Sequence, residues 1–140
     1  MKNLLPLLLS MVLALSACNE EMVFSRYRPV STEGWQRADT IRFDVYDVPH
    51  AGMYGEQIGL RTNSRYPFKA LTIIVSQQVR PSGRERTDTI DARLTDDEGT
   101  LLGEGICHYQ YLFPLPDIKL LKGDSLQQYW TVRALMDDAV

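Results

Sequence analysis

The residues best suited to chemistry in this 140-residue chain are few and lie far apart in the sequence. The two cysteines are Cys18 and Cys107, and the two histidines are His50 and His108. None of them stands at the repeated short spacings that a zinc site requires. Cys107 and His108 are the residue types of a thiol protease, but we expect them on one strand, where neighbours point to opposite faces. These residues therefore predict neither a metal site nor an activated nucleophile.

The acidic and glycine-rich stretches are equally poor candidates for a site. The sequence "DDEG" at residues 96–99 offers carboxylates for calcium, but it lacks the alternating ligand spacing and the distant glutamate of an EF-hand. A solvated turn is the better interpretation. The Gly-Glu-Gly triplet at residues 103–105 precedes a predicted strand, whereas a phosphate cradle opens a helix. With no Gly-x-Ser-x-Gly elbow either, we expect no catalytic residues, no metal and no cofactor, and hence no enzyme.

Cys18 stands out because of the segment that precedes it. Lys2 supplies a positive charge, and residues 4–15 form an apolar run that is too short to cross a bilayer as a helix, which takes about 20 residues. The tetrad "LSAC" at residues 15–18 resembles the bacterial lipobox, whose cysteine receives a diacylglycerol and becomes the first mature residue. The resemblance implies that residues 1–17 are a signal peptide and that Cys18 is the lipidation site, carrying fatty acids such as palmitate.

Lipidation would have two consequences. The acyl chains would anchor the protein to a bilayer, because each buried methylene contributes about 0.8 kcal/mol and more than one chain makes attachment stable. The modification would also use the Cys18 sulfur, which leaves Cys107 without a partner for an intrachain disulfide, and we expect Cys107 to be buried. The net charge of −3 and the lack of a basic cluster argue against nucleic acid and against an electrostatic hold on anionic lipid.

The rest of the chain divides into a tether and one domain. Residues 18–33 have no clean periodicity and are predicted to be the lipidated N-terminus and tether, followed by a domain over residues 34–140. Apolar and polar residues alternate there with a period of two, as in strands with one buried face. The runs lie at residues 40–46, 58–62, 71–79, 87–94, 101–111 and 127–136, with turns at residues 81–83, 96–99 and 120–125. This pattern predicts an all-β fold, an antiparallel β-sandwich of immunoglobulin-like or jelly-roll-like type.

The aromatic residues leave an alternative function open. They are Trp35, Tyr46, Tyr54, Tyr66, Tyr109, Tyr111, Tyr129 and Trp130. Several of them on one face of a sandwich could stack on sugar rings, as in a surface glycan-binding lipoprotein of a nutrient-uptake system. The other interpretation is that most fill the core and cap its ends. Pro67 restricts Tyr66 to extended backbone, and we expect Phe68 to close one end of the sandwich.

Motifs in a fixed order over nearly the whole predicted mature chain resemble the gliding-motility lipoprotein family GldH. They are Gly34-Trp35 with Asp39 and Phe43, Leu60-Arg61 with Tyr66-Pro67-Phe68, Asp88-Thr89-Ile90, the acidic turn at residues 96–99, and Leu102-Gly103. The family's last strand runs on from a Met-Arg pair. This chain has Met136-Asp137 instead and stops at Val140, so we expect a shortened or missing final strand.

The resemblance implies a lipid-anchored, non-enzymatic protein of a Gram-negative cell envelope, associated with the outer membrane. Such proteins belong to the gliding machinery and the protein-secretion apparatus linked to it. The expected partners are the bilayer, through acylated Cys18, and other envelope proteins of that complex, with no nucleic acid. The family supplies no catalytic, cofactor or metal-binding residues for this chain. Some relatives occur in organisms that do not glide, so the resemblance does not by itself imply gliding.

Overall fold

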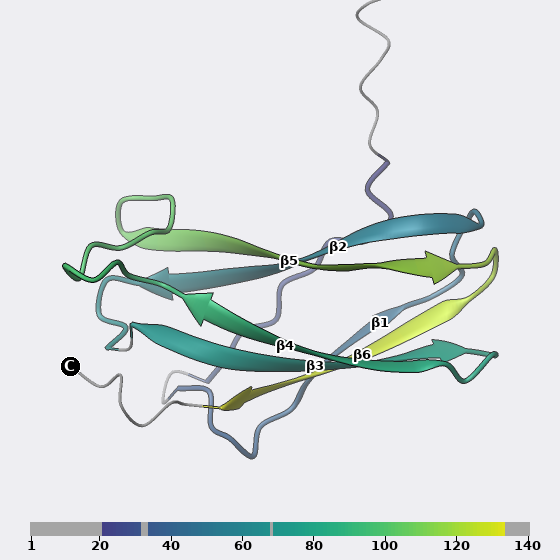
Figure 1. Ribbon diagram of the computed structural model, residues 1–140, viewed down its shortest axis with the longest axis horizontal. Helices are drawn as coiled ribbons and strands as arrows, with labels where there is room; N and C mark the ends of the chain where they lie inside the picture. Colours follow the sequence, from purple (N-terminus) through teal and green to yellow (C-terminus); the bar gives the residue numbers. More distant parts are fainter. Residues whose placement is uncertain (1–20, 32–33, 68, 134–140) are drawn as a thin grey trace, which may run out of the picture.

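The described part of the chain folds into six strands (Figure 1). The computed structural model describes residues 21–31, 34–67 and 69–133. The strands are β1 (Ile41–Val45), β2 (Gly52–Asn63), β3 (Ala70–Arg80), β4 (Glu85–Arg93), β5 (His108–Leu120) and β6 (Ser125–Arg133). These ranges contain no helix, and so none that is long and apolar enough to cross a membrane.

The strands form two antiparallel sheets packed face to face. One sheet has four strands in the order β1-β6-β3-β4, and the other pairs β2 with β5. Only the β3–β4 connection stays within one sheet, and every other connection crosses to the opposite sheet (Figure 1). The predicted all-β sandwich is therefore confirmed.

The alternation of residues in the sequence decides which side chains enter the space between the sheets. In β3, Ile73 and Val75 are fully buried, while Ile74 between them faces outward. Ile73 lies opposite Ile90 of β4 and Val132 of β6, so one apolar layer crosses three strands. Each fully buried side chain of this size contributes about 1.5–3 kcal/mol relative to exposure. The period of two thus both forms the strands and holds the sheets together.

Two apolar clusters fill the interior. The first consists of Ile58, Leu71, Ile73, Val75, Ala92, Leu94, Tyr111, Leu115 and Val132. The second consists of Val48, Val79, Ile118, Leu120 and Leu126. Trp35, Tyr66 and Trp130 are half-buried against the first cluster, and the Trp130 ring centroid lies 4.5 Å from that of Phe43. Both tryptophans therefore belong to the core and its margin.

The connection between β4 and β5 corrects the sequence-based prediction. Residues 101–107 form a loop instead of the predicted strand, and β5 begins at His108. A Cβ atom at Gly105, where φ is 143°, would lie 1.9 Å from the carbonyl oxygen of His108, so only glycine fits this turn. Cys107 is exposed in the loop, and its predicted burial is wrong. We had also expected Cys107 and His108 to share a strand, but Cys107 lies before the start of β5.

Strand β5 continues through Pro114 and Pro116, beyond the predicted run. Proline is compatible with an edge strand, and both strands of a two-stranded sheet are edges. The register against β2 shifts between Tyr54, which lies opposite Ile118, and Glu56, which lies opposite Leu115. Strand β5 therefore carries one extra residue at this point, a β-bulge, which frees backbone carbonyls from the ladder.

Candidate functional site

The predicted lipidation site, Cys18, lies outside the described residues, three positions before the first of them, Glu21. Phe68, which we expected to close one end of the sandwich, also lies outside the described residues. So do residues 134–140, where we expected a shortened or missing last strand. What the structure does describe is how the tether after the predicted anchor meets the domain, and which polar groups the domain holds.

The tether is attached to the outer face of the two-stranded sheet through Tyr27. Its ring lies under the guanidinium group of Arg61, with the Arg61 Cζ atom 4.4 Å from the ring centroid. Its hydroxyl accepts a hydrogen bond of 3.1 Å from the Gln110 side-chain amide. Arg61 and Gln110 are register partners on β2 and β5, so one tyrosine contacts both strands. Residues 18–33 were predicted to be a tether, and part of that tether rests on the domain.

The Tyr27 ring packs directly on a glycine, Gly59, between Arg61 and Gln110, and we call this contact site the Tyr27 seat. At Gly59 of β2, a Cβ atom would lie 2.8 Å from the Tyr27 hydroxyl oxygen and 3.2 Å from two ring carbons. Any side chain here would therefore push the ring away. An isolated glycine inside a strand often marks such a close approach, and this is the sequence signal that could have located the seat.

A buried polar cluster separates the two apolar clusters of the core. Gln77 of β3 and Gln128 of β6 lie opposite each other, and both point inward. Each donates its side-chain amide to the same oxygen of Glu56, with a distance of 2.7 Å from Gln128. The indole nitrogen of Trp130 donates in turn to the Gln128 carbonyl oxygen at 3.3 Å. The carboxylate thus connects the two sheets through hydrogen bonds.

Arg86 of β4 supplies the positive charge of this cluster. Its guanidinium bonds Glu56 at 2.9 Å and Asp88 at 2.6 Å. It also donates to the backbone carbonyls of Pro116 at 2.9 Å and Asp117 at 3.0 Å, at the bulge of β5. One side chain therefore satisfies two carboxylates and two bulge carbonyls and ties β4 to β2 and β5.

The electrostatics of Glu56 reflect its burial. Desolvation raises the pKa of its carboxyl above the ordinary value, and the hydrogen bonds and charge of Gln77 and Arg86 oppose that rise. The side chain is only 10% exposed, and its named partners occupy both oxygens. A raised carboxyl pKa can mark a catalytic acid. Here the hydrogen-bond partners of the carboxylate are amides and a guanidinium, which also binds Asp88, so the arrangement suits the joining of strands.

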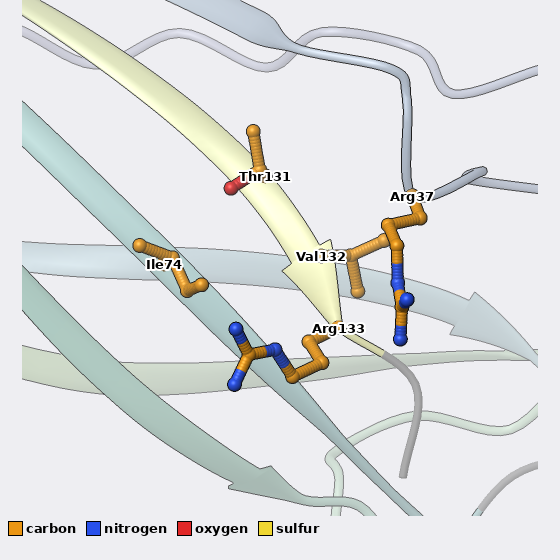
Figure 2. A pocket seen from close by; sticks show the side chains of 5 residues that line it. All are labelled: Arg37, Ile74, Thr131, Val132 and Arg133. Atoms are coloured by element: carbon orange, nitrogen blue, oxygen red, sulfur yellow. The ribbon is translucent and has the colours of Figure 1, made fainter. Parts of the chain in front are cut away.

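The surface hollows offer little chemistry. One open hollow of about 430 Å³ lies between Arg37, from the loop before β1, and Arg133, at the end of β6 (Figure 2). Its floor is formed by Ile74, Thr131 and Val132. A second hollow of about 380 Å³ lies beside Trp35 and the start of β1. The described residues that line the first are two arginines, a threonine and two apolar residues, and they bring no acid and base together.

The remaining sequence candidates stay apart. No group of three or more histidine, cysteine, aspartate or glutamate residues that could hold a metal ion occurs in residues 21–31, 34–67 and 69–133. Within the same ranges, the strongly exposed aromatic side chains are Tyr27 and Tyr46, at 48% and 68%. Tyr27 is engaged with the sheet and Tyr46 follows β1, so they do not form the exposed row that glycan stacking requires.

The outer face of the four-stranded sheet is mostly polar. Hydrogen bonds between neighbouring strands join Thr72 to Asp91 at 2.8 Å and Gln78 to Glu85 at 2.9 Å. None of the large apolar side chains of β3, β4 and β6 is fully exposed on this face, in the part of the chain that the structure covers. The two sheets thus present chemically different outer faces.

Comparison with known proteins identifies the family of the chain. The family model described as GldH lipoprotein matches residues 22–136. The gliding motility lipoprotein GldH of Flavobacterium johnsoniae is 34% identical over 104 residues, which is 74% of this chain and 64% of that relative. The chain therefore spans less than two thirds of the length of that relative. No solved structure matches the chain. The chain belongs to the GldH lipoprotein family.

Proposed function

We propose that the chain is a non-enzymatic, lipid-anchored component of the gliding machinery and its linked protein-secretion apparatus. Its anchor is acylated Cys18, its location is the outer membrane, and its partners are other envelope proteins. The observation that carries the proposal is the family match over residues 22–136 in a chain whose residues 15–18 have the lipobox pattern. The matched family and the relative are both described as lipoproteins.

The chemistry of the domain supports a role in protein contacts. The largely buried carboxylate of Glu56 is occupied by Gln77, Gln128 and Arg86, which leaves it bound to the fold itself. The polar outer face of the four-stranded sheet is a suitable contact surface, because non-obligate protein interfaces are about as polar as the rest of a protein surface. We assign the envelope partners to this face.

Substitution of the two cysteines tests the proposal in the gliding organism. Cys18→Ala should move the protein from the membrane to the soluble fraction and should abolish spreading on agar and secretion together. Cys107→Ala is the matched control, because this thiol is exposed in a loop and should be dispensable. A soluble Cys18→Ala protein that supports normal spreading and secretion would contradict the proposal.

Substitution on the four-stranded sheet tests the contact role. Thr89 of β4 faces outward, and Thr89→Arg adds a long charged side chain there without entering the core. Chains purified from solubilised envelope should lose the co-purifying envelope proteins when they carry Thr89→Arg, while their urea stability stays that of the wild type. Unchanged co-purification with Thr89→Arg and with the corresponding Thr131→Arg change would exclude this face.

A further inference from the structure

We propose that the outer face of the two-stranded sheet rests on the bilayer that carries the lipid anchor. The inference builds on the proposed acylation of Cys18 and adds which face of the domain meets the lipid. Three features support it: the Tyr27 seat, the short reach of the tether, and the different chemistry of the two outer faces.

The Tyr27 seat fixes where the tether leaves the domain. Gly59, which forms the seat, lies within β2, and Gln110 binds the ring from β5. From there the described chain runs back toward its first residues, and this purple segment lies on the side of the two-stranded sheet away from the four-stranded sheet (Figure 1). The anchor therefore approaches the domain from the side of β2 and β5.

The length of the tether limits the alternatives. Only nine residues lead from Cys18 to Tyr27, a reach of about 30 Å when fully extended. The three residues from Cys18 to Glu21 span at most about 10 Å of that reach. A path around the sandwich to its other face must pass two sheets about 10 Å apart and their outer side chains, which uses nearly the whole reach. The face that carries Tyr27 is the one that the anchor holds near the lipid.

The chemistry of this face fits the headgroup region of a bilayer. Met22 of the tether, Met53 of β2 and Leu112 of β5 are 78%, 64% and 57% exposed. Arg61 and Lys119 lie on the same face, each opposite a strand partner that also faces outward. Tyrosine and long basic side chains are favoured where apolar stems meet polar headgroups.

The opposite face has the contrasting character. Its outward residues on β3 and β4 are mostly polar, with half-buried Ile74 as the apolar exception, and several bond across strands, as Ser76 does with Thr87 at 3.3 Å. In the described strands β3, β4 and β6 no large apolar side chain is strongly exposed. This face has little to gain from contact with lipid and is left free for protein partners.

Photo-crosslinking tests which face meets the lipid. The full chain, processed by the expressing cell and purified from its membranes, carries p-benzoylphenylalanine at Leu112 or, as the matched control, at Thr89. Each protein is returned to phosphatidylcholine vesicles, floated on a gradient and irradiated, and lipid adducts are measured by mass spectrometry. We expect several-fold more adduct at position 112 than at position 89. Equal yields, or more adduct at position 89, overturn the inference.

A substitution at Gly59 tests whether the packing of Tyr27 on β2 decides which face of the domain meets the lipid. Gly59→Val should displace Tyr27, because a Cβ atom there already lies 2.8 Å from its hydroxyl. Gly55→Val on the same strand is the control, since the nearest atom to a Cβ there is 3.8 Å away. We expect Gly59→Val chains to float normally but to lose the preference for position 112, and Gly55→Val chains to keep it. A Gly59→Val chain with the full preference overturns the role of the seat, whereas a wild-type chain that does not float contradicts the acylation of Cys18.

Discussion

Removal of Arg86 should destabilise the domain more than any change at a neighbouring exposed arginine. Arg86→Met keeps the aliphatic stem but leaves Glu56 as a charge in the core with amide donors alone. Breaking a buried ion pair by removal of one partner costs about 3–5 kcal/mol. The lower end applies here, because the Arg86 side chain is 28% exposed and Gln77 and Gln128 still donate to the carboxylate.

We therefore expect a loss of about 3 kcal/mol in the free energy of unfolding, or roughly a hundredfold in the folding equilibrium. Arg84→Met is the matched control. Arg84 lies on the same side of the sandwich and donates to the Lys119 carbonyl at 2.5 Å, but this contact is exposed and involves no carboxylate. Its loss should cost under about 1 kcal/mol. Urea unfolding followed by the fluorescence of Trp35 and Trp130 gives both values.

The pH dependence of the stability loss in Arg86→Met distinguishes the contribution of the Arg86 charge from that of its packing. Burial raises the pKa of Glu56, and the loss of Arg86 should raise it further, because Arg86 lowers it in the wild type. A carboxyl whose pKa is higher in the folded state binds its proton more tightly there, so stability increases as pH falls from neutral toward the ordinary pKa. The loss caused by Arg86→Met should therefore be smaller at about pH 5 than at about pH 7.5.

A second substitution completes the test of the buried pair. In the Arg86→Met background, Glu56→Gln removes the uncompensated charge and should recover part of the stability at neutral pH. It should also remove most of the dependence on pH. Losses below about 1 kcal/mol for Arg86→Met, or equal losses for Arg86→Met and Arg84→Met, would refute the reasoning.

Two further expectations follow from burial. Ile73→Ala removes a fully buried side chain and should cost about 2–5 kcal/mol in the free energy of unfolding, whereas Ile74→Ala on the outer face should cost much less. Urea titration of the two variants measures both losses, and equal losses would contradict the assignment of the faces. The thiol of Cys107 should react with a maleimide in the folded protein as fast as in urea, because it is exposed, and strong protection in the native state would contradict the loop at residues 101–107.

The alternation of side chains predicted most of the sandwich. The inward set Ile73, Val75 and Val79 of β3 follows directly from the period of two. The pattern is local, so it identifies strands and their buried faces. It does not state which strands pair, and the order β1-β6-β3-β4 depends on contacts between residues far apart in the sequence.

The errors have physical reasons as well. The pattern at residues 101–107 looks like a strand, but Gly105 adopts a positive φ and the chain turns there, which exposes Cys107. The predicted strand ended too early, at residue 111, because β5 runs on through Pro114 and Pro116, which are tolerated at an edge. That edge position is a property of the sheet and is not visible in a single segment.

The two polar features of the domain were missed for different reasons. Gln77 stands at an inward position between Val75 and Val79, so its burial could have been predicted from the pattern. Its partner Glu56 lies on another strand, and no local signal connects them. The Tyr27 seat is likewise a contact between the tether and β2, for which the isolated Gly59 was the available sign.

The mass of the mature N-terminus tests the central claim most directly. Cells that express the full chain are fed an alkyne analogue of palmitate, and the membrane-bound protein is then purified and digested. The account predicts an N-terminal peptide that begins at Cys18 and carries the labelled acyl chains, with the label absent from Cys18→Ala protein. An unlabelled mature chain, or one whose first residues still include the apolar run at residues 4–15, would contradict it.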